Sequence, residues 1–389
     1  MNKQIYPLLI AQFLSAFADN AILFTVIAMV MHSHTLPTWY VPALQSSFLI
    51  AFVVLAPWVG GFADNYAKSR VLIVANLIKA VGAGLLLCKV EPLLAYGIVG
   101  AGAAIYSPAK YGILPELVGH EVLVKANSWI EGSTILAILS GMVVGARLAD
   151  YSVTMALSFT IILFIASAGI ALLLPMRIAK EKTPGLRLAE FVAQIGQFLL
   201  RRRSRFAILG ASLFWASAAA LRVIIVAWAP LILHSHNATE ISQLTLFLAI
   251  GIIAGSVIVP RLIPLEHIRR VRIPAYIMAV LIAVLSLTGD LLSARIALFL
   301  IGMAGGVFIV PINAALQELG QQSIGSGSAV AIQNFFQNFA MLISVGSYTY
   351  ASAEHVNPVT AMQCLAALLF VFTFLIALKL PKRKLGQEA

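Results

Sequence analysis

The sequence predicts an all-α membrane protein of twelve transmembrane helices, arranged as two six-helix halves. Of its 389 residues, 61% are apolar and only 11% are charged, and the mean hydropathy is +0.96. Soluble domains are about 45–50% apolar and about 25% charged. A bilayer accepts apolar side chains on every face of a helix, whereas the surface of a soluble protein does not. This composition therefore excludes a water-soluble fold.

Twelve apolar segments each come close to the roughly 20 residues that a helix needs to cross a bilayer. The first six belong to an N-terminal half, residues 1–175, and the last six to a C-terminal half, residues 206–389. The segments lie near 7–31, 43–63, 70–89, 92–113, 129–149, 153–175, 206–232, 243–263, 272–289, 294–316, 327–351 and 358–379. An even number of spans places both termini on the same side of the membrane.

The distribution of positive charge predicts the orientation, because cytoplasmic loops retain Lys and Arg. Most of the 26 Lys and Arg residues lie in the termini, in alternate loops and in the polar stretch 176–205 between the halves. The opposite loops carry only Lys89, Arg147 and Arg295. Both termini are therefore predicted to be cytoplasmic. Residues 176–205 are predicted to form a cytoplasmic linker with room for an interfacial amphipathic helix.

Several classes of function are excluded by the same composition. The net charge of +11 is spread between apolar segments rather than gathered on one face, so no nucleic-acid surface is expected. Cys88 and Cys364 lie in apolar runs, and the seven histidines lie in or beside loops, so no metal site or other cofactor site is expected. A membrane-embedded acyltransferase is the alternative from the enzyme class, but its histidine and aspartate motif is missing. The sequence predicts no enzyme activity.

Five ionisable residues lie inside the predicted spans: Asp19, Lys79, Lys110, Glu131 and Arg222. Each costs at least about 2.5–3.5 kcal/mol at a bilayer centre, so each needs a partner, water or a substrate. The alternative to a functional role is a buried ion pair that only fixes helix packing. Asp19 lies roughly 18 Å from the start of its helix, at about 1.5 Å per residue, and Arg222 lies at least as deep. These two rank first as candidates for substrate binding.

A weak internal repeat relates the two halves, as in transporters built from parallel repeats. A shift of about 203 positions, found by aligning the sequence with itself, places Pro108 on Pro311 and Asp19 on Arg222. Asp19 and Arg222 would then occupy related positions on the first helix of each half, where both can face a central cavity.

The loop between the second and third spans resembles the signature loop of the major facilitator superfamily. It reads GGFADNYAKSR, residues 60–70. The signature is imperfect, since Ala67 and Lys68 replace its usual glycine-centred turn. Asp64, Lys68 and Arg70 are predicted to brace a gate rather than to contact substrate.

Longer stretches resemble one family within that superfamily. The motifs are AQFLSAFADNAILF (11–24), YSPAKYGILPEL (106–117), VKANSWIEGSTILAIL (124–139), SLFWASAAALR (212–222), VPINAALQELG (310–320) and GSAVAIQNFFQNFAML (327–342). From end to end the chain is similar to the bacterial lysophospholipid transporters. One departure is the loop GQQSIGSG (320–327), where Gln321 and Gln322 replace expected basic residues, which argues against a charge gate in this loop.

The resemblance implies a flippase of the bacterial inner membrane that works without an obvious ion gradient. It would import lysophosphatidylethanolamine and related lysolipids from the outer to the inner leaflet for re-acylation. The implied partners are the lysolipid, membrane lipids and a cytoplasmic acyltransferase/acyl-carrier-protein synthetase, and a monomer is expected. The alternative function is a proton-coupled exporter of drugs or other small molecules in the same superfamily.

The expected substrate site follows from the chemistry of a lysolipid. Asp19 would meet the ammonium group and Arg222 the phosphate through charge-assisted hydrogen bonds. The other candidates are Asn20, Lys110 and Glu131. An acyl chain would lie against Phe13, Phe17, Phe214 and Trp215. The alternative for these aromatic side chains is simple packing between helices.

Overall fold

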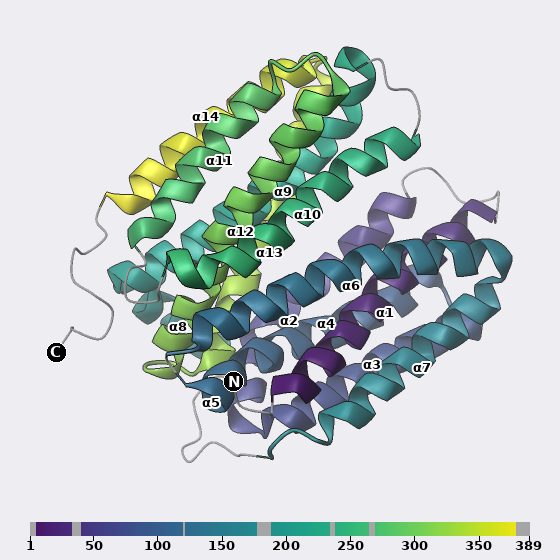
Figure 1. The fold of residues 1–389 in the computed structure, drawn as a ribbon. Helices are drawn as coiled ribbons and strands as arrows, with labels where there is room; N and C mark the ends of the chain where they lie inside the picture. Colours follow the sequence, from purple (N-terminus) through teal and green to yellow (C-terminus); the bar gives the residue numbers. More distant parts are fainter. Residues whose placement is uncertain are drawn as a thin grey trace. The chain divides into compact units, whose positions relative to one another are not determined.

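The chain is helical throughout the part that the computed structural model describes, which is residues 5–32, 40–119, 121–176, 188–233, 238–263 and 269–378 (Figure 1). No strand occurs within these ranges. Residues 177–187 of the predicted linker and the basic residues 382–384 near the C-terminus lie outside the described residues. A chain with few polar side chains satisfies its backbone groups in lipid by forming helices, since each helix pairs its own N–H and C=O groups.

The described helices are of two kinds, long apolar helices and three shorter ones, α5, α8 and α11. Their bounds are α1 (Ile5–His32), α2 (Tyr40–Asn65), α3 (Lys68–Leu87), α4 (Pro92–Gly112), α5 (Leu114–Val118), α6 (Leu123–Tyr151), α7 (Val153–Ala171), α8 (Leu188–Leu200), α9 (Arg202–Ile232), α10 (Ala238–Leu262), α11 (Arg272–Leu285), α12 (Leu291–Gln321), α13 (Ser326–Ala353) and α14 (Pro358–Ala377).

Eleven of the described helices are long and apolar enough to cross a membrane, and they match eleven of the twelve predicted spans. The remaining predicted span, 272–289, corresponds to α11, which has 14 residues. At about 1.5 Å per residue this helix is roughly 21 Å long, less than the roughly 30 Å of a hydrocarbon core. Just after its last residue, Ser286 and Thr288 donate their hydroxyls to the carbonyls of Ala283 and Leu285.

The chain divides into two compact units whose limits differ from those of the predicted halves. The first unit contains Met1–Val122, Ser133–Gly196 and Gln317–Phe335. The second contains Leu123–Gly132, Gln197–Leu316 and Phe336–Ala389. The start of α13 therefore packs within the first unit, and the start of α6 within the second. The halves 1–175 and 206–389 stay a prediction.

In the first unit, α4 packs against α2 and α3, while α7 packs against α1 and α3. Glycines in α6 allow it to approach α1 closely, because a Cβ at Gly141 or Gly145 would meet the backbone of Phe17 or Ala21. Small residues at such spacing are typical of helix contacts in membranes. This packing holds the middle of α1, which carries Asp19, between its neighbours (Figure 1).

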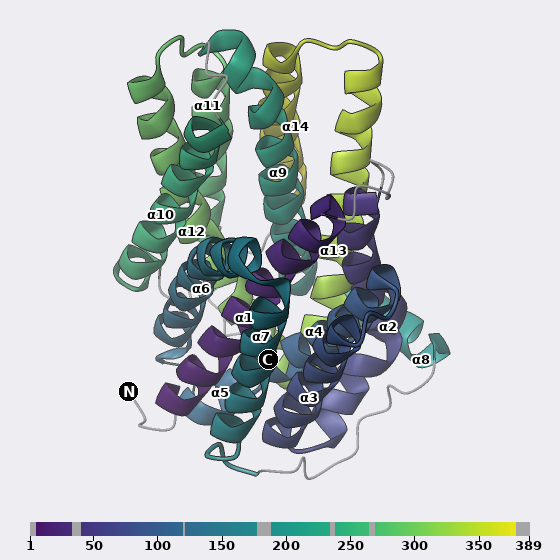
Figure 2. The same cartoon turned by 90° about the vertical axis from the view of Figure 1, so that its right-hand side faces the viewer.

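In the second unit, α14 packs against α9 and α11. Two glycine pairs, each spaced by four residues, join α10 to α12. A Cβ at Gly251 or Gly255 would meet the backbone of α12, and a Cβ at Gly302 or Gly306 would meet the backbone of α10. The two backbones can approach this closely because neither helix places a side chain at the crossing. Figure 2 shows α10 and α12 together with α11 in this unit.

The linker contains the helix α8, as the sequence analysis allowed. Phe191 and Phe198, seven residues apart on one face, are buried, whereas Val192 and Leu200 are exposed. The ring of Phe191 meets that of Phe335 edge to face, with centroids 6.0 Å apart. A helix in the linker is thus confirmed, while its position at a membrane interface stays a prediction.

Candidate functional site

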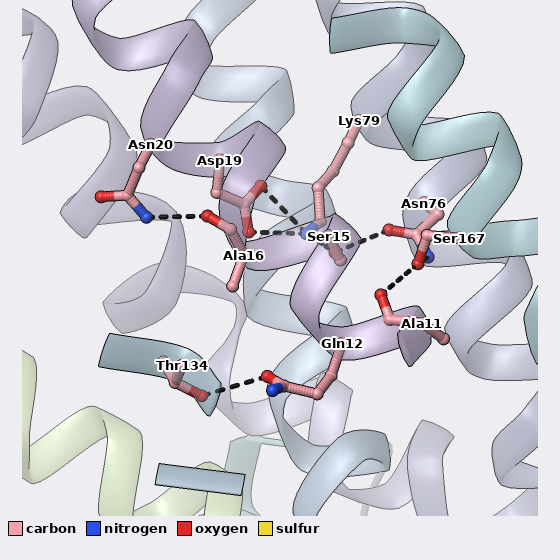
Figure 3. A network of polar contacts seen from close by, with 10 residues as sticks. All are labelled: Ala11, Gln12, Ser15, Ala16, Asp19, Asn20, Asn76, Lys79, Thr134 and Ser167. Atoms are coloured by element: carbon pink, nitrogen blue, oxygen red, sulfur yellow. Dashed lines mark hydrogen bonds and ion pairs between the residues drawn. The ribbon is translucent and has the colours of Figure 1, made fainter. Parts of the chain in front are cut away.

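The polar centre of the first unit is an ion pair between Asp19 of α1 and Lys79 of α3 (Figure 3). Lys79 Nζ donates to both carboxylate oxygens, at 2.8 Å and 3.0 Å. The Lys79 side chain is fully buried, whereas the Asp19 side chain is 21% exposed. The pair therefore neutralises a lysine that has no access to solvent, while part of the Asp19 side chain stays exposed.

A chain of hydrogen bonds extends from this pair to α7. Lys79 Nζ also donates to Ser15 Oγ at 2.7 Å, and Ser15 Oγ donates to Asn76 Oδ1 at 2.8 Å. Asn76 Nδ2 donates to Ser167 Oγ at 2.8 Å, and Ser167 Oγ donates to the carbonyl of Ala11 at 2.6 Å (Figure 3). Buried polar groups avoid their desolvation cost when they are bonded in this way. The chain fixes α1, α3 and α7 against one another.

The same region explains how the apolar surroundings accommodate a lysine. A Cβ at Gly102 of α4 would collide with the Lys79 side chain, so the glycine provides the space along which this side chain runs. Lys79 Nζ lies 4.6 Å from the centre of the Tyr106 ring and 5.2 Å from that of Phe164. Aromatic faces at such distances attract a cation. The ammonium group is therefore held on several sides.

The sequence analysis named Lys79 as ionisable but assigned it no place in the site, and it missed Ser15, Asn76 and Ser167. A signal was present in the spacing of the polar residues. Gln12, Ser15 and Asp19 follow one another at three and four residues, which places them on one face of α1. Asn76 and Lys79 share a face of α3 in the same way. Gln12 itself bonds to Ser133 and Thr134 of α6.

The other candidates on α1 lie around Asp19. Asn20 Nδ2 donates to the carbonyl of Ala16 at 2.8 Å, and its Oδ1 points away from the network (Figure 3). Phe13 and Phe17 are half-buried, with ring centroids 6.2 Å apart, and Phe17 meets Phe159 edge to face. The middle of α1 thus combines an accessible carboxylate, an amide oxygen and two partly exposed aromatic rings.

Arg222 and Trp215 lie on α9 in the second unit. Arg222 is exposed and forms no hydrogen bond or ion pair with any residue that the structure describes. Trp215 is half-buried, and its ring meets that of Phe214 edge to face with centroids 5.3 Å apart. The predicted joint action of Asp19 and Arg222 on one ligand stays a prediction.

Lys110 and Glu131 are both buried, at 9% and 3% exposure. Lys110 Nζ lies 4.2 Å from the centre of the Tyr111 ring in the first unit. Glu131 belongs to the second unit, where Asn313 Nδ2 of α12 donates to its carboxylate at 2.9 Å. The sequence analysis missed Asn313 as a partner, although it named Glu131.

A related contact occurs at the position that the internal repeat pairs with Glu131. This residue is Asn334 of α13, whose Nδ2 donates to Ser107 Oγ of α4 at 2.9 Å in the first unit. Glu131 and Asn334 are on the fifth predicted span of their halves, and each bonds to the fourth predicted span of the other half. The two contacts therefore agree with the repeat.

Asp64, the acidic residue of the signature loop, is buried at the start of α13. Its carboxylate accepts hydrogen bonds from the backbone N–H groups of Gly327 at 2.8 Å and Ser328 at 2.7 Å. These are among the first N–H groups of a helix, which lack partners within the helix and carry partial positive charge. The carboxylate thus caps α13 from a different helix.

The glycines of the loop GQQSIGSG make room for this cap. Gly325 has a φ of +95° and Gly327 has its amide on the carboxylate, and a Cβ at either position would collide with Asp64. A left-handed backbone conformation favours glycine. The loop therefore binds the carboxylate with backbone N–H groups. It does not need basic side chains at positions 321 and 322, where it carries Gln321 and Gln322.

The two basic gate candidates differ in their surroundings. Lys68 is buried, and its Nζ lies 2.6 Å from Glu116 of α5 and 3.7 Å from Asp64. Arg70 is exposed and forms no ion pair with a described residue. Lys68 therefore belongs to the cap around Asp64, whereas Arg70 does not. No group of three metal-binding side chains occurs among the described residues.

Comparison with known proteins assigns the family. Residues 8–345 match the sequence profile of the Major Facilitator Superfamily. The chain belongs to this superfamily. The chain is similar to proteins named lysophospholipid transporter LplT. It is 40% identical to the one from Salmonella paratyphi B and 41% identical to the one from Salmonella heidelberg. Each alignment covers 90% of this chain and 88% of the relative.

Solved structures of the superfamily share the fold. The Escherichia coli fucose–proton symporter superposes with a TM-score of 0.75 at 15% identity, covering 96% of this chain and 97% of that one. The human organic anion transporter MFSD10 gives 0.79 at 14% identity, covering 97% and 100%. At these identities the likeness concerns the fold alone. The protein is a multi-pass membrane transporter of the superfamily and not an enzyme.

Proposed function

We propose that the protein is a lysophospholipid flippase of the bacterial inner membrane. It moves lysophosphatidylethanolamine and related lysolipids from the outer to the inner leaflet, where they are re-acylated. The observation that carries this proposal is the 40–41% identity, over 90% of the chain, to transporters named for lysophospholipids. The polar centre on α1 supports it, because a zwitterionic head group needs an accessible acidic group in an apolar protein.

Asp19 is the proposed partner of the head-group ammonium. A carboxylate has about four lone-pair sites, and Lys79 Nζ donates one hydrogen bond to each of the two oxygens. The 21% of the Asp19 side chain that is exposed leaves acceptor sites for a second ammonium group. Asn20 Oδ1 offers a further acceptor one residue away. Lys79 thus orients Asp19 without occupying it completely.

Arg222 is the proposed partner of the phosphate. Its guanidinium group presents five N–H donors in a planar fork that fits two phosphate oxygens. Arg222 is exposed and makes no hydrogen bond with a described residue. Its donors can therefore bind the phosphate without first breaking a hydrogen bond to another described residue. The acyl chain would lie against Phe13, Phe17 and Trp215, whose rings are all partly exposed.

The gate proposed for Asp64, Lys68 and Arg70 rests on the cap of α13. Transport by rocking requires contacts that form in one state and break in another. Two charge-assisted hydrogen bonds from backbone N–H groups suit this role, since they can be replaced by water without rearranging either helix. Lys110 and Glu131 are proposed to line the inner mouth rather than the head-group site.

Uptake of labelled lysophosphatidylethanolamine into spheroplasts tests the proposal. We expect wild-type uptake well above the empty vector, and loss of uptake by Asp19→Asn and Arg222→Ala at equal expression. Arg202→Gln is the matched control, because Arg202 is an exposed arginine at the start of the same helix as Arg222. Normal uptake by either Asp19→Asn or Arg222→Ala would contradict the head-group assignment.

Addition of an uncoupler distinguishes the alternative function. We expect uptake to continue, because a fixed ion pair such as Asp19–Lys79 does not need to exchange protons for the lysolipid to bind. Uptake that stops with the uncoupler, or no uptake above the vector, would favour a proton-coupled exporter. The proposed acyltransferase partner is tested by co-purification from the same membranes, with recovery of the transporter alone as the contradicting result.

A further inference from the structure

The second unit has an apolar pocket that the proposed transport site does not use. It has a volume of about 510 Å³ and lies between the end of α10, the first half of α11 and the middle of α12. Leu262, Ile277, Leu281, Met303 and Ala304 are among its lining residues. Its volume falls within the roughly 300–1,000 Å³ that is usual for ligand sites. Figure 2 shows the three helices together.

Arg270 is the charged residue in the lining, and it marks one end of the pocket. It is exposed and stands just before α11, between Arg269 and Arg272. Arg270 thus gives this end of the lining a positive charge, whereas the other lining residues are apolar.

The length of the pocket matches one leaflet of a bilayer. Its lining runs from Arg270 to Leu281 along α11, which is roughly 16 Å at about 1.5 Å per residue. Half of a hydrocarbon core is about 15 Å. On the predicted orientation, Arg270 lies at the cytoplasmic surface and Leu281 near the middle of the membrane. Basic pockets between transmembrane helices on this side are suited to lipid head groups.

We propose that this pocket holds one resident anionic phospholipid of the cytoplasmic leaflet. Its phosphate lies at Arg270, and one acyl chain fills the space between α10, α11 and α12. A zwitterionic lipid would bring its own ammonium group to the end of the pocket that carries Arg270, so an anionic lipid such as phosphatidylglycerol is favoured. The ligand stays bound during transport, because its site is formed within one unit and includes neither Asp19 nor Arg222.

Native mass spectrometry of the full chain, released from membranes in mild detergent, tests the proposal. Phosphatidylglycerol and phosphatidylethanolamine are titrated against delipidated protein. We expect one tight site for phosphatidylglycerol in the wild type, bound about tenfold more weakly by Arg270→Gln. Ala304→Phe, which fills the pocket, should remove the site. Arg202→Gln removes a positive charge on the same side of the membrane and should bind as the wild type does.

Three outcomes would overturn the proposal: equal affinity of wild type and Arg270→Gln, equal retention of the two lipids, or preferential retention of a lysolipid in the pocket. The last outcome would make the pocket a step of the transport route. Arg270 is exposed, so its variant should fold even if Ala304→Phe does not. Uptake of lysophosphatidylethanolamine is measured in parallel, so that failure of the proposed transport function is seen separately from loss of the bound lipid.

Discussion

Asp19 in α1 and Arg222 in α9 come from positions that the internal repeat relates, yet their surroundings are opposite. Asp19 is paired with a fully buried lysine, and that lysine belongs to a chain of hydrogen bonds through three helices. Arg222 is exposed and forms no bond with a described residue. A charge inside a helix bundle can thus serve both the fold and the ligand, or the ligand alone. It serves the fold where a buried charged neighbour depends on it.

The difference has an energetic origin. Lys79 has no exposed surface, so its charge needs Asp19 whether or not substrate is present. No described residue forms an ion pair with Arg222, so no buried partner depends on its charge. Removing Asp19 should therefore damage both the fold and transport, whereas removing Arg222 should damage transport alone.

The largest expected effect comes from breaking the ion pair on one side. Asp19→Asn leaves the ammonium group of Lys79 buried without its counter-charge, which should lower the free energy of unfolding by about 3 kcal/mol. The double variant Asp19→Asn/Lys79→Met should recover most of this stability and still fail to transport. Thermal unfolding in detergent measures the first effect and lysolipid uptake the second. A single variant as stable as the double variant would show that the pair does not support the fold.

The next effect concerns Arg222. Arg222→Ala should lower uptake at least about tenfold, equivalent to about 1.4 kcal/mol, because the substrate phosphate loses its fork of donors. Its melting temperature should remain that of the wild type, in contrast to Asp19→Asn. Arg222→Lys keeps the charge but not the fork and should fall between the two. A clear drop in melting temperature for Arg222→Ala would end the distinction between the two charges.

The cap of α13 should have a smaller effect. Asp64→Asn keeps one oxygen acceptor but loses the negative charge at the helix N-terminus, so the free energy of unfolding should fall by about 1–2 kcal/mol. Arg70→Gln is the matched control in the same loop and should change stability by less than about 0.5 kcal/mol. Thermal unfolding of both variants checks this. Equal stability of the two variants would show that the charge of Asp64 does not stabilise the start of α13.

The smallest effect lies outside the membrane, at the start of α12. The carboxylate of Asp290 accepts from the backbone N–H of Ser293 at 2.9 Å, and hydrogen bonding to Ser293 lowers the pKa of Asp290 below its ordinary value. A lowered pKa in the folded state means that the stabilisation is present above the ordinary value, near about pH 4, and is lost as the pH falls through the folded value.

Asp290→Asn keeps an oxygen acceptor for the cap but cannot titrate. Between pH 6 and pH 3, the wild type should lose slightly more thermal stability than this variant does. The two pH profiles should be parallel if Asp290 has no part in capping α12.

Much of this protein is determined by local sequence. The apolar composition identifies the membrane class. The apolar segments locate the spans, because each stretch of about 20 apolar residues is long enough to cross the bilayer by itself. The helix in the linker and the deep positions of Asp19 and Arg222 could be read in the same way. The short α11 is an exception, because its 14 residues are fewer than the apolar segment 272–289 predicts.

Only the tertiary structure decided the partners. Lys79 meets Asp19 because Gly102 leaves space for its side chain between helices far apart in the sequence, and Asp64 meets the first N–H groups of α13 because Gly325 and Gly327 carry no side chain there. Spacing along one helix predicts which residues share a face. It does not predict which face of another helix packs against that face. That choice depends on how all the helices pack at once, so the ion pair and the helix cap could not be derived from the sequence.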